Sequence, residues 1–220
     1  MSDEEKESII IILLGDCSVG KTSIINRFMN REFETYELST IGVELVKKKI
    51  EFNYENEKKE LILQIYDSAG QERYKSISTS YIKKADGIIL VFDLSKKETF
   101  NSLFDWMKKI KDNIKIEKNI ILVGNKNDIP NNERKVFQND IDDLIKNKFK
   151  DINDLTFMET SARDNYNIYE LFINISIKVL DNRKINGRSR AKTINLNDKK
   201  YNNNNNNNNN DNNNKKKKCC

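Results

Sequence analysis

Six consecutive apolar residues, Ile9 to Leu14, run directly into the sequence GDCSVGKT, which spans Gly15 to Thr22. A short, branched apolar run predicts a buried β-strand, and the residues that follow Thr22 predict a helix. Two glycines five positions apart, followed by a lysine and a hydroxyl residue, match the pattern G-x-x-x-x-G-K-[ST]. The chain must therefore turn tightly between a strand and a helix near its start, and this unit constrains the fold more than any other feature.

The residue types in this turn point to phosphate chemistry. Glycines allow backbone N–H groups to wrap around a diphosphate, and the start of a helix adds positive potential. Lys21 can bridge the outer phosphates, and the Thr22 hydroxyl can ligate Mg²⁺. A chance match in a glycine-containing turn is the alternative, and the strand before the turn and the helix after it argue against that alternative. We therefore expect a nucleotide-binding loop made of Gly15, Asp16, Cys17, Ser18, Val19, Gly20, Lys21, Thr22 and Ser23.

Strand and helix patterns alternate along the rest of the chain. Further short apolar runs lie at residues 61–66, 87–92, 119–123 and 156–158, and segments with helical spacing lie at 100–114, 141–149 and 168–179. This alternation predicts an α/β fold with a six-stranded, mostly parallel sheet, helices on both faces and ligands at the carboxyl ends of the strands. A polar strand at 44–52, joined to 61–66 through residues 53–60, predicts one antiparallel hairpin at the edge of the sheet.

A second polar loop, DSAGQ, follows the apolar run that ends at Tyr66. An aspartate at the carboxyl end of a strand, here Asp67, can approach Mg²⁺, usually through water. Gly70 lets its N–H face a terminal phosphate, and Gln71 can orient an attacking water. Such a loop alone is also compatible with an ordinary surface loop, but together with the phosphate loop it predicts a site that hydrolyses a nucleotide.

A third loop, NKND, comprises Asn125 to Asp128 and follows another strand end. The Asp128 carboxylate can accept hydrogen bonds from the N1–H and the exocyclic amine of guanine, a donor pattern that adenine lacks. The loop therefore selects GTP over ATP. After the last strand, Ser161, Ala162 and Arg163 would place a backbone N–H at guanine O6.

These elements, in this order and spacing, resemble those of a Ras-like small GTPase over residues 9–180, and within that superfamily the chain is most similar to Rab proteins. The Rab likeness rests on STIGVE at 39–44, LQIYDSAGQERYKSIS at 63–78, YIKKADGIILVFDLS at 81–95 and the final Cys219-Cys220. The resemblance implies a P-loop NTPase three-layer sandwich. It also implies that Thr40 joins Thr22 and Asp67 as a Mg²⁺ ligand only when the γ-phosphate is present, that Phe33 packs on the edge of guanine, and that Lys126 lies over the face of the base.

The resemblance further implies a membrane-anchored GTPase that cycles between GTP-bound and GDP-bound states, hydrolyses GTP and regulates vesicle trafficking. Gln71, Lys21 and Gly70 are the expected catalytic residues. Because nothing resembles an arginine supplied by an inserted domain, we expect slow hydrolysis that an activating protein accelerates. The other expected partners are an exchange factor, a GDP dissociation inhibitor, a prenylation escort and effectors, with no nucleic acid and a monomeric chain. The expected effector surface comprises Ile41, Gly42, Val43, Glu44, Leu45, Tyr66 and Tyr81.

Several positions depart from the Rab pattern. Cys17-Ser18 replaces the usual Ser-Gly or Ser-Ala, so the extra hydroxymethyl of Ser18 crowds the phosphate loop, and Glu37 stands where a tyrosine is usual. Arg163 replaces the commoner lysine, and Leu45 and Tyr66 replace a phenylalanine and a tryptophan that many effectors contact. We therefore expect intact GTP binding with an unusual effector set.

Two other functions stay open from these residues. Ser18 and Glu37 suggest a GTP-loaded binding module that scarcely hydrolyses its nucleotide, although the presence of Gln71 favours the enzyme. A P-loop ATPase or kinase conflicts with Asp128, which would repel adenine.

The charge distribution divides the chain into a body and a tail. From Arg183 onward there are eleven basic and two acidic residues, which leaves the rest of the 220-residue chain slightly acidic although the whole has a net charge of +5. We expect an acidic extension at 1–8, a GTPase domain at 9–182 and a disordered, basic, asparagine-rich tail at 183–220. Lys215–Lys218 followed by Cys219 and Cys220 resembles the Rab substrate for double geranylgeranylation, which predicts residence at the cytoplasmic face of an intracellular or plasma membrane with a cytosolic pool.

The composition excludes several other function classes. There is no histidine, and the three cysteines are Cys17 and the last two residues, so we expect neither histidine-based catalysis, nor a zinc site, nor a disulfide framework. The start of the chain is acidic and its apolar run is too short for a secretory signal, and no stretch approaches the roughly 20 apolar residues of a membrane span.

Overall fold

The computed structural model of the chain describes residues 7–34, 40, 42–68, 75–114, 119–152 and 154–205, with only the backbone described at 75–78 and 188–205. Its strands are β1 (Ser8–Leu14), β2 (Val43–Tyr54), β3 (Glu57–Ser68), β4 (Gly87–Asp93), β5 (Asn119–Asn125) and β6 (Thr156–Thr160). Its helices are α1 (Lys21–Phe28), α2 (Lys75–Lys84), α3 (Lys97–Asn101), α4 (Leu103–Asn113), α5 (Gln138–Asp143), which continues as a π-helical turn (Leu144–Lys148), and α6 (Ile168–Asn205).

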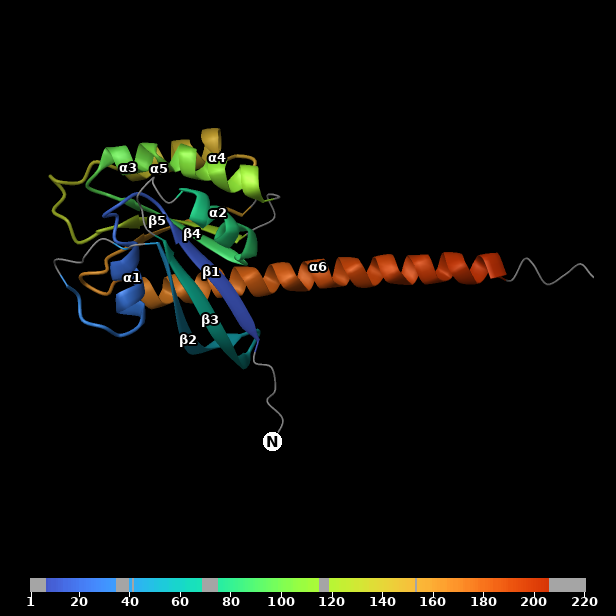
Figure 1. The fold of residues 1–220 in the computed structure, drawn as a ribbon. Helices are drawn as coiled ribbons and strands as arrows, with labels where there is room; N and C mark the ends of the chain where they lie inside the picture. The colour runs from blue at the N-terminus through green and yellow to red at the C-terminus, as the bar shows by residue number, and fades with distance from the viewer. Residues whose placement is uncertain are drawn as a thin grey trace, which may run out of the picture. The chain divides into compact units, whose positions relative to one another are not determined.

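The six strands form one sheet in the order β2-β3-β1-β4-β5-β6. The pairs β1–β3, β1–β4, β4–β5 and β5–β6 are parallel, and only the edge pair β2–β3 is antiparallel. Helices cover both faces, with α2 to α5 on one side and α1 and the start of α6 on the other (Figure 1). The predicted α/β fold, including its single antiparallel edge strand, is therefore confirmed.

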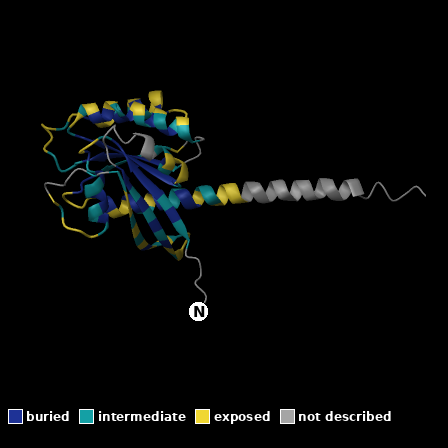
Figure 2. Cartoon of the chain, viewed as in Figure 1, coloured by how far each residue is buried: buried dark blue, intermediate teal, exposed yellow. Residues whose placement is uncertain are grey.

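Strand alternation divides the core into two layers. On one face, Ile12 and Leu14 of β1 join residues of β4 and β5 in a cluster with Met107 of α4 and Ile82 of α2. On the other face, the rings of Phe28 in α1 and Phe172 in α6 stack with centroids 3.9 Å apart. Buried residues accordingly fill the central strands, whereas exposed and half-buried residues alternate along the edge strand β2 and gather near the turn of the hairpin (Figure 2). A parallel sheet covered on both faces requires this nearly continuous apolar character in its central strands.

The polar hairpin is longer than predicted. Strands β2 and β3 pair as far as Tyr54 and Glu57, so the connection is only Glu55-Asn56 and not residues 53–60. Both turn residues have positive φ, 51° and 69°, as a tight two-residue hairpin turn requires. The residues that we assigned to a loop belong to the turn and to the two hairpin strands beside it, and most of their side chains are exposed.

Two helical predictions also change. The helical segment predicted at 100–114 begins at Lys97 and is divided at Ser102 into α3 and α4. The segment predicted at 141–149 begins at Gln138 and ends as the π-helical turn. In that turn the Phe149 N–H donates to the Leu144 carbonyl at 3.0 Å, which is the five-residue bond of a π-helix.

Helix α6 continues to Asn205, whereas we expected order to end near Asn182. Lysine and arginine, which are frequent after Asn182, have high helix propensity, and between Asn182 and Asn205 only Gly187 strongly disfavours a helix. Residues up to Val179 form one compact unit, and the remainder of the chain belongs to a second. Among the described residues, no helix combines the length and apolar character needed to cross a membrane.

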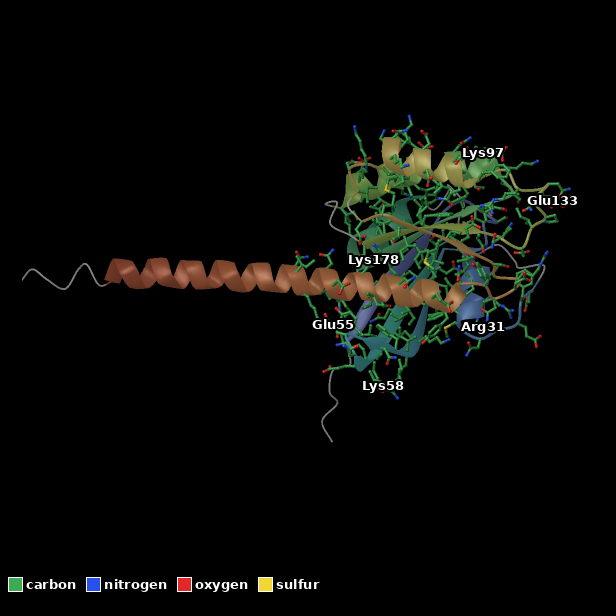
Figure 3. All side chains as sticks on the ribbon, turned by 180° about the vertical axis from the view of Figure 1, so that it is seen from behind. Arg31, Glu55, Lys58, Lys97, Glu133 and Lys178 are labelled. Atoms are coloured by element: carbon green, nitrogen blue, oxygen red, sulfur yellow. The ribbon has the colours of Figure 1, made fainter. Side chains whose placement is uncertain are left out.

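Charged side chains of both signs lie on the outside of the first unit, among them Arg31, Glu55 and Lys97 (Figure 3). Lys97 forms an ion pair with Asp140 at 2.7 Å, which connects α3 to α5 across the surface. Such exposed pairs contribute little to stability, roughly 0–1 kcal/mol each. The stability of this unit therefore depends mainly on the two apolar layers.

Replacement of Gly87 by alanine tests the packing of the second layer. A Cβ at Gly87 would lie 2.7 Å from Cγ1 of Ile175 in α6, so Gly87→Ala should lower the free energy of unfolding by about 1–3 kcal/mol. Denaturant titration followed by circular dichroism measures this change. The matched control is Gly187→Ala, because no atom lies within 4 Å of a Cβ there; equal destabilisation by both variants would contradict the packing argument.

Candidate nucleotide-binding site

The loop between β1 and α1 passes very close to the neighbouring strands. A Cβ at Gly15, whose φ is 141°, would overlap the carbonyl oxygen of Val91 in β4. A Cβ at Gly20, whose φ is 95°, would overlap the side-chain amide of Asn125 in β5. Because an L-residue with a side chain can satisfy neither the backbone angle nor the space, both glycines of the motif are required where they stand. Gly20 also caps the start of α1.

Lys21 lies inside this loop and is buried. Its Nζ donates hydrogen bonds to the carbonyl oxygens of Gly15 at 3.0 Å and Asp16 at 2.8 Å. Burial lowers the pKa of the Lys21 ammonium below its ordinary value, and the nearby charge of Asp67 opposes that effect. The loop therefore surrounds a cation whose charge is poorly compensated by solvent, which is an arrangement suited to binding the outer phosphates of a nucleotide.

Three oxygen-bearing side chains converge beside Lys21. The Thr22 hydroxyl donates to Oδ2 of Asp67 at 2.7 Å and lies 2.9 Å from the hydroxyl oxygen of Thr40. Thr22 lies in the first turn of α1, Asp67 lies near the end of β3 and Thr40 precedes β2, so three separate segments meet here. Hydroxyl and carboxylate oxygens fit Mg²⁺, which accepts one or two carboxylates and completes its shell with water and phosphate oxygens.

Asn125 connects three segments around the phosphate loop. Its Nδ2 donates to the Val19 carbonyl at 2.9 Å, and its Oδ1 accepts from the hydroxyl of Thr160 in β6 at 3.1 Å. Asn125 is buried, and both of these side-chain hydrogen bonds are made to other residues of the chain. Asn125 therefore fixes the loop against β5 and β6.

Lys126 lies above this junction with a left-handed backbone, φ 70°. Its Nζ donates to the Ser18 carbonyl at 3.0 Å and pairs with Oδ2 of Asp93 at 2.6 Å. Asp93 is fully buried, and its other oxygen accepts from the backbone and hydroxyl of Ser95 at 2.8 and 2.6 Å. These contacts hold the lysine stem over the site, where we predicted it to cover a base.

The residues predicted to recognise guanine also come together. Oδ1 of Asp128 accepts from the Ser161 hydroxyl at 2.6 Å, and Oδ2 lies 2.9 Å from Nη1 of Arg163. Ala162, between the last two, is buried. The NKND loop and the loop after β6 therefore form one unit, and its role in reading a base stays a prediction.

The described part of the expected effector surface is continuous. Leu45 of β2 lies opposite Tyr66 of β3 in the sheet register, and the rings of Tyr66 and Tyr81 lie 4.6 Å apart between centroids. Gly42 precedes β2, and Val43 and Glu44 are the first two residues of that strand. Leu45 is exposed, so this patch presents apolar atoms to solvent.

The remaining predicted site residues are exposed or half-buried, or lie outside the described part of the chain. Cys17 and Ser18 are exposed at the turn of the phosphate loop, and Ser23 and Phe33 are half-buried. Ser18 has a φ of 61°, in the left-handed region that an L-residue adopts at a cost of roughly 1 kcal/mol. The residues that lie outside the described part of the chain are Glu37, Ile41, Gly70, Gln71, Lys215–Lys218, Cys219 and Cys220.

Two contacts that stabilise the site were not predicted from the sequence. The indole N–H of Trp106 in α4 donates to Oδ1 of Asp16 at 2.8 Å, so the helix holds the phosphate loop. Arg134 pairs through both terminal nitrogens with the carboxylate of Glu159, which precedes the Ser161 loop. In the sequence, the only sign of the Trp106–Asp16 hydrogen bond is that Trp106 is the single tryptophan. The N–H of a partly buried indole needs a hydrogen-bond partner.

Comparison with known proteins agrees with this geometry. The model of the Ras family matches residues 10–181. The chain is 35% identical over 195 residues to Ras-related protein Rab-13 of Mesocricetus auratus, which covers 86% of this chain and 91% of that protein. It is 36% identical over 165 residues to Ras-related protein Rab-11B of Dictyostelium discoideum, covering 75% and 70% of the two chains. Over 171 residues it is 39% identical to Ras-related protein Rab-12 of Mus musculus, covering 77% and 66%.

Replacement of Trp106 by phenylalanine tests its hold on the phosphate loop. Trp106→Phe keeps the ring but removes the donor to the partly buried Asp16 carboxylate, so a bound guanine nucleotide should dissociate about three- to tenfold faster. Stopped-flow release of a fluorescent GDP derivative measures this rate. Tyr169→Phe is the control, because it removes one hydrogen bond, to the Glu51 carbonyl at 3.0 Å, without touching the loop. Unchanged release from Trp106→Phe would contradict the assignment.

Proposed function

Because this chain belongs to the Ras family and is a Rab-type small GTPase that hydrolyses GTP and acts in vesicle trafficking, we propose that it works as a membrane-anchored switch. In this proposal the GTP-bound form binds effectors and the GDP-bound form releases them. Regulators and effectors are general features of the class.

The meeting of Thr22, Thr40 and Asp67 is the observation that carries this proposal. Thr40 lies in the segment between α1 and β2, yet its hydroxyl oxygen is 2.9 Å from that of Thr22 in the phosphate loop. A bound Mg²⁺ would neutralise phosphate charge at this point. In this proposal Thr40 exchanges its contact with Thr22 for the ion and the terminal phosphate, so that loss of that phosphate on hydrolysis releases the segment on which Thr40 lies.

Hydrolysis requires two further groups next to the terminal phosphate. In this proposal the Gly70 N–H binds that phosphate and Gln71 orients the attacking water, while Lys21 stabilises the charge that develops on the phosphate oxygens. Arg163 pairs with Asp128, which this proposal places on the base side of the site, and the proposal assigns no arginine of the chain to the terminal phosphate. We therefore propose that an activating protein supplies the missing positive charge.

Selection of guanine is assigned to Asp128. Its carboxylate is held by the buried Ser161 hydroxyl at 2.6 Å, so its orientation is fixed before a base arrives. A fixed carboxylate can accept hydrogen bonds from the N1–H and the exocyclic amine of guanine. In adenine the N1 atom is an acceptor, so it would face the carboxylate unfavourably. We propose Lys126 and Phe33 as the groups that pack on the base.

The effector surface is proposed at Leu45, Tyr66 and Tyr81, together with residues 41–44. These side chains connect directly to the site, because Tyr66 precedes Asp67 and Val43 pairs with Ser68 in the sheet. Movement of the Thr40 segment would therefore reach this patch. An exchange factor, a GDP dissociation inhibitor, a prenylation escort and effectors are the proposed partners of the monomeric chain, which binds no nucleic acid.

Membrane attachment is assigned to the tail. Two isoprenoid groups on Cys219 and Cys220 would give stable anchoring, and Lys215–Lys218 would add attraction to an anionic leaflet of roughly 1 kcal/mol per charge. The proposed location is the cytoplasmic face of an intracellular or plasma membrane, with a cytosolic pool.

One observation favours a second candidate. Ser18 has a left-handed backbone at a position where the chain could use glycine, and its carbonyl is held by Lys126 at 3.0 Å. A rigid, crowded phosphate loop could slow hydrolysis so far that the protein acts as a GTP-loaded binding module.

The full chain purified from eukaryotic cells tests both proposals together. We expect bound guanine nucleotide with GDP in excess, and a mass increase corresponding to two geranylgeranyl groups. A variant with both Cys219→Ser and Cys220→Ser should lose that mass and move to the cytosol while it keeps its nucleotide, which serves as the control for folding. Nucleotide analysis by chromatography, intact mass and cell fractionation measure the three quantities.

Other results for the bound nucleotide or for the cysteines would favour the alternative or contradict the proposal. GTP in excess in the purified protein would favour the binding module over the hydrolysing switch. Adenine nucleotide would contradict the assignment to Asp128, and unmodified cysteines in the membrane fraction would contradict anchoring by the tail.

A further inference from the structure

Arg163 makes a contact that the guanine assignment does not use. Its Nη1 lies 2.9 Å from Oδ2 of Asp128, in an ion pair whose two side chains are 60% and 8% exposed. The other oxygen, Oδ1, accepts from the Ser161 hydroxyl at 2.6 Å. Each oxygen of the carboxylate assigned to guanine therefore already has a partner within the chain. Because Asp128 is so little exposed, an incoming base must share or displace one of them.

The two partners differ in how easily they can leave. Ser161 is buried, its backbone is paired with Tyr166 in both directions at 2.9 and 3.1 Å, and its hydroxyl oxygen also accepts from the Asp164 N–H at 3.0 Å. Arg163 is mostly exposed, so its guanidinium can exchange Asp128 for solvent at little cost. The group that yields to a base is therefore Arg163.

The backbone of Arg163 is fixed although its side chain is not. Nη2 of Arg27, in α1, donates to the Arg163 carbonyl at 3.1 Å. This contact places the start of the Arg163 side chain at a constant position beside Asp128. The guanidinium can thus return to Oδ2 each time the carboxylate becomes free.

We propose that Arg163 is a specificity-determining residue that competes with the guanine base for Asp128, and so weakens nucleotide binding and speeds release. This inference rests on the proposed function, because it assumes that Asp128 reads guanine. A competitor within the chain acts at a constant effective concentration, so it lowers the apparent affinity by a constant factor. For a pair exposed on one side, that factor is about two- to fivefold.

Replacement of Arg163 by glutamine removes the competitor and is the direct test. We expect Arg163→Gln to bind GDP about two- to fivefold more tightly than the unchanged chain, with slower release. The effect should be smaller with inosine diphosphate, whose base lacks the exocyclic amine and depends less on Asp128. It should also shrink in 0.5 M NaCl, which screens the Arg163 pair in the unchanged chain. Equilibrium titration and stopped-flow release of fluorescent GDP and inosine diphosphate give these values.

Two further variants separate competition from other effects of charge. Lys111→Gln removes one positive charge from a similar surface pair, with Asp151 at 2.7 Å, and should leave GDP affinity unchanged. Arg163→Lys keeps the charge but has a more strongly hydrated head, so its affinity should lie between those of the unchanged chain and the glutamine variant. It also provides a result if the glutamine variant does not fold.

The opposite signs overturn the inference. Weaker GDP binding by Arg163→Gln would show that Arg163 holds the base instead of competing with it. Equal effects on GDP and inosine diphosphate would show that it acts on the phosphates, and unchanged affinity would show that it has no role. If the unchanged chain fails to bind GDP at all, the proposed function fails and not this inference alone.

Discussion

The close approach of the phosphate loop to the carboxyl ends of β4 and β5 is the constraint on which the site depends. Gly15 lies against the Val91 carbonyl and Gly20 against the Asn125 amide, so neither position has room for a side chain. This approach brings the Val19 carbonyl within 2.9 Å of Asn125 and directs the buried Lys21 ammonium into the loop. Because β4 and β5 are parallel neighbours, their carboxyl ends lie side by side, and the phosphate loop contacts both.

The contacts of the site spread from this junction in two directions. On the side proposed to bind the base, the Thr160 hydroxyl donates to Asn125, the Asn127 N–H donates to the Thr160 carbonyl, and the Ser161 hydroxyl donates to Asp128. Toward the terminal phosphate, Thr22 bonds Asp67 at the end of β3. Thr40 also contacts Thr22 on this side, and the strands that follow Thr40 and contain Asp67 carry the patch of Leu45 and Tyr66. In the proposed function, a change at the terminal phosphate would therefore reach the surface through one edge of the sheet, apart from the contacts proposed to bind the base.

The sequence predicted those parts of the site that depend on local rules. The two glycines, Lys21 and Thr22 follow from one motif, and Asp67 and Asp128 follow from their positions after buried strands. The Asp16–Trp106 bond was not predicted, because it joins residues 90 positions apart and no local pattern requires it. The length of the hairpin was missed because its polar residues resemble a loop, whereas pairs such as Lys49 with Glu60 at 2.9 Å satisfy them on an edge strand. The extent of α6 was missed because its apolar spacing ends before its helix does.

The dependence of nucleotide release on free Mg²⁺ in a Thr40→Ala variant tests the central claim most directly. Release of a fluorescent GDP and of a fluorescent non-hydrolysable GTP analogue would be measured over a range of free Mg²⁺ concentrations. If Thr40 is held by the ion and the terminal phosphate together, the variant should need at least about tenfold more Mg²⁺ to retain the GTP analogue and the same amount to retain GDP. An equal shift for both nucleotides, or none for either, would contradict the account.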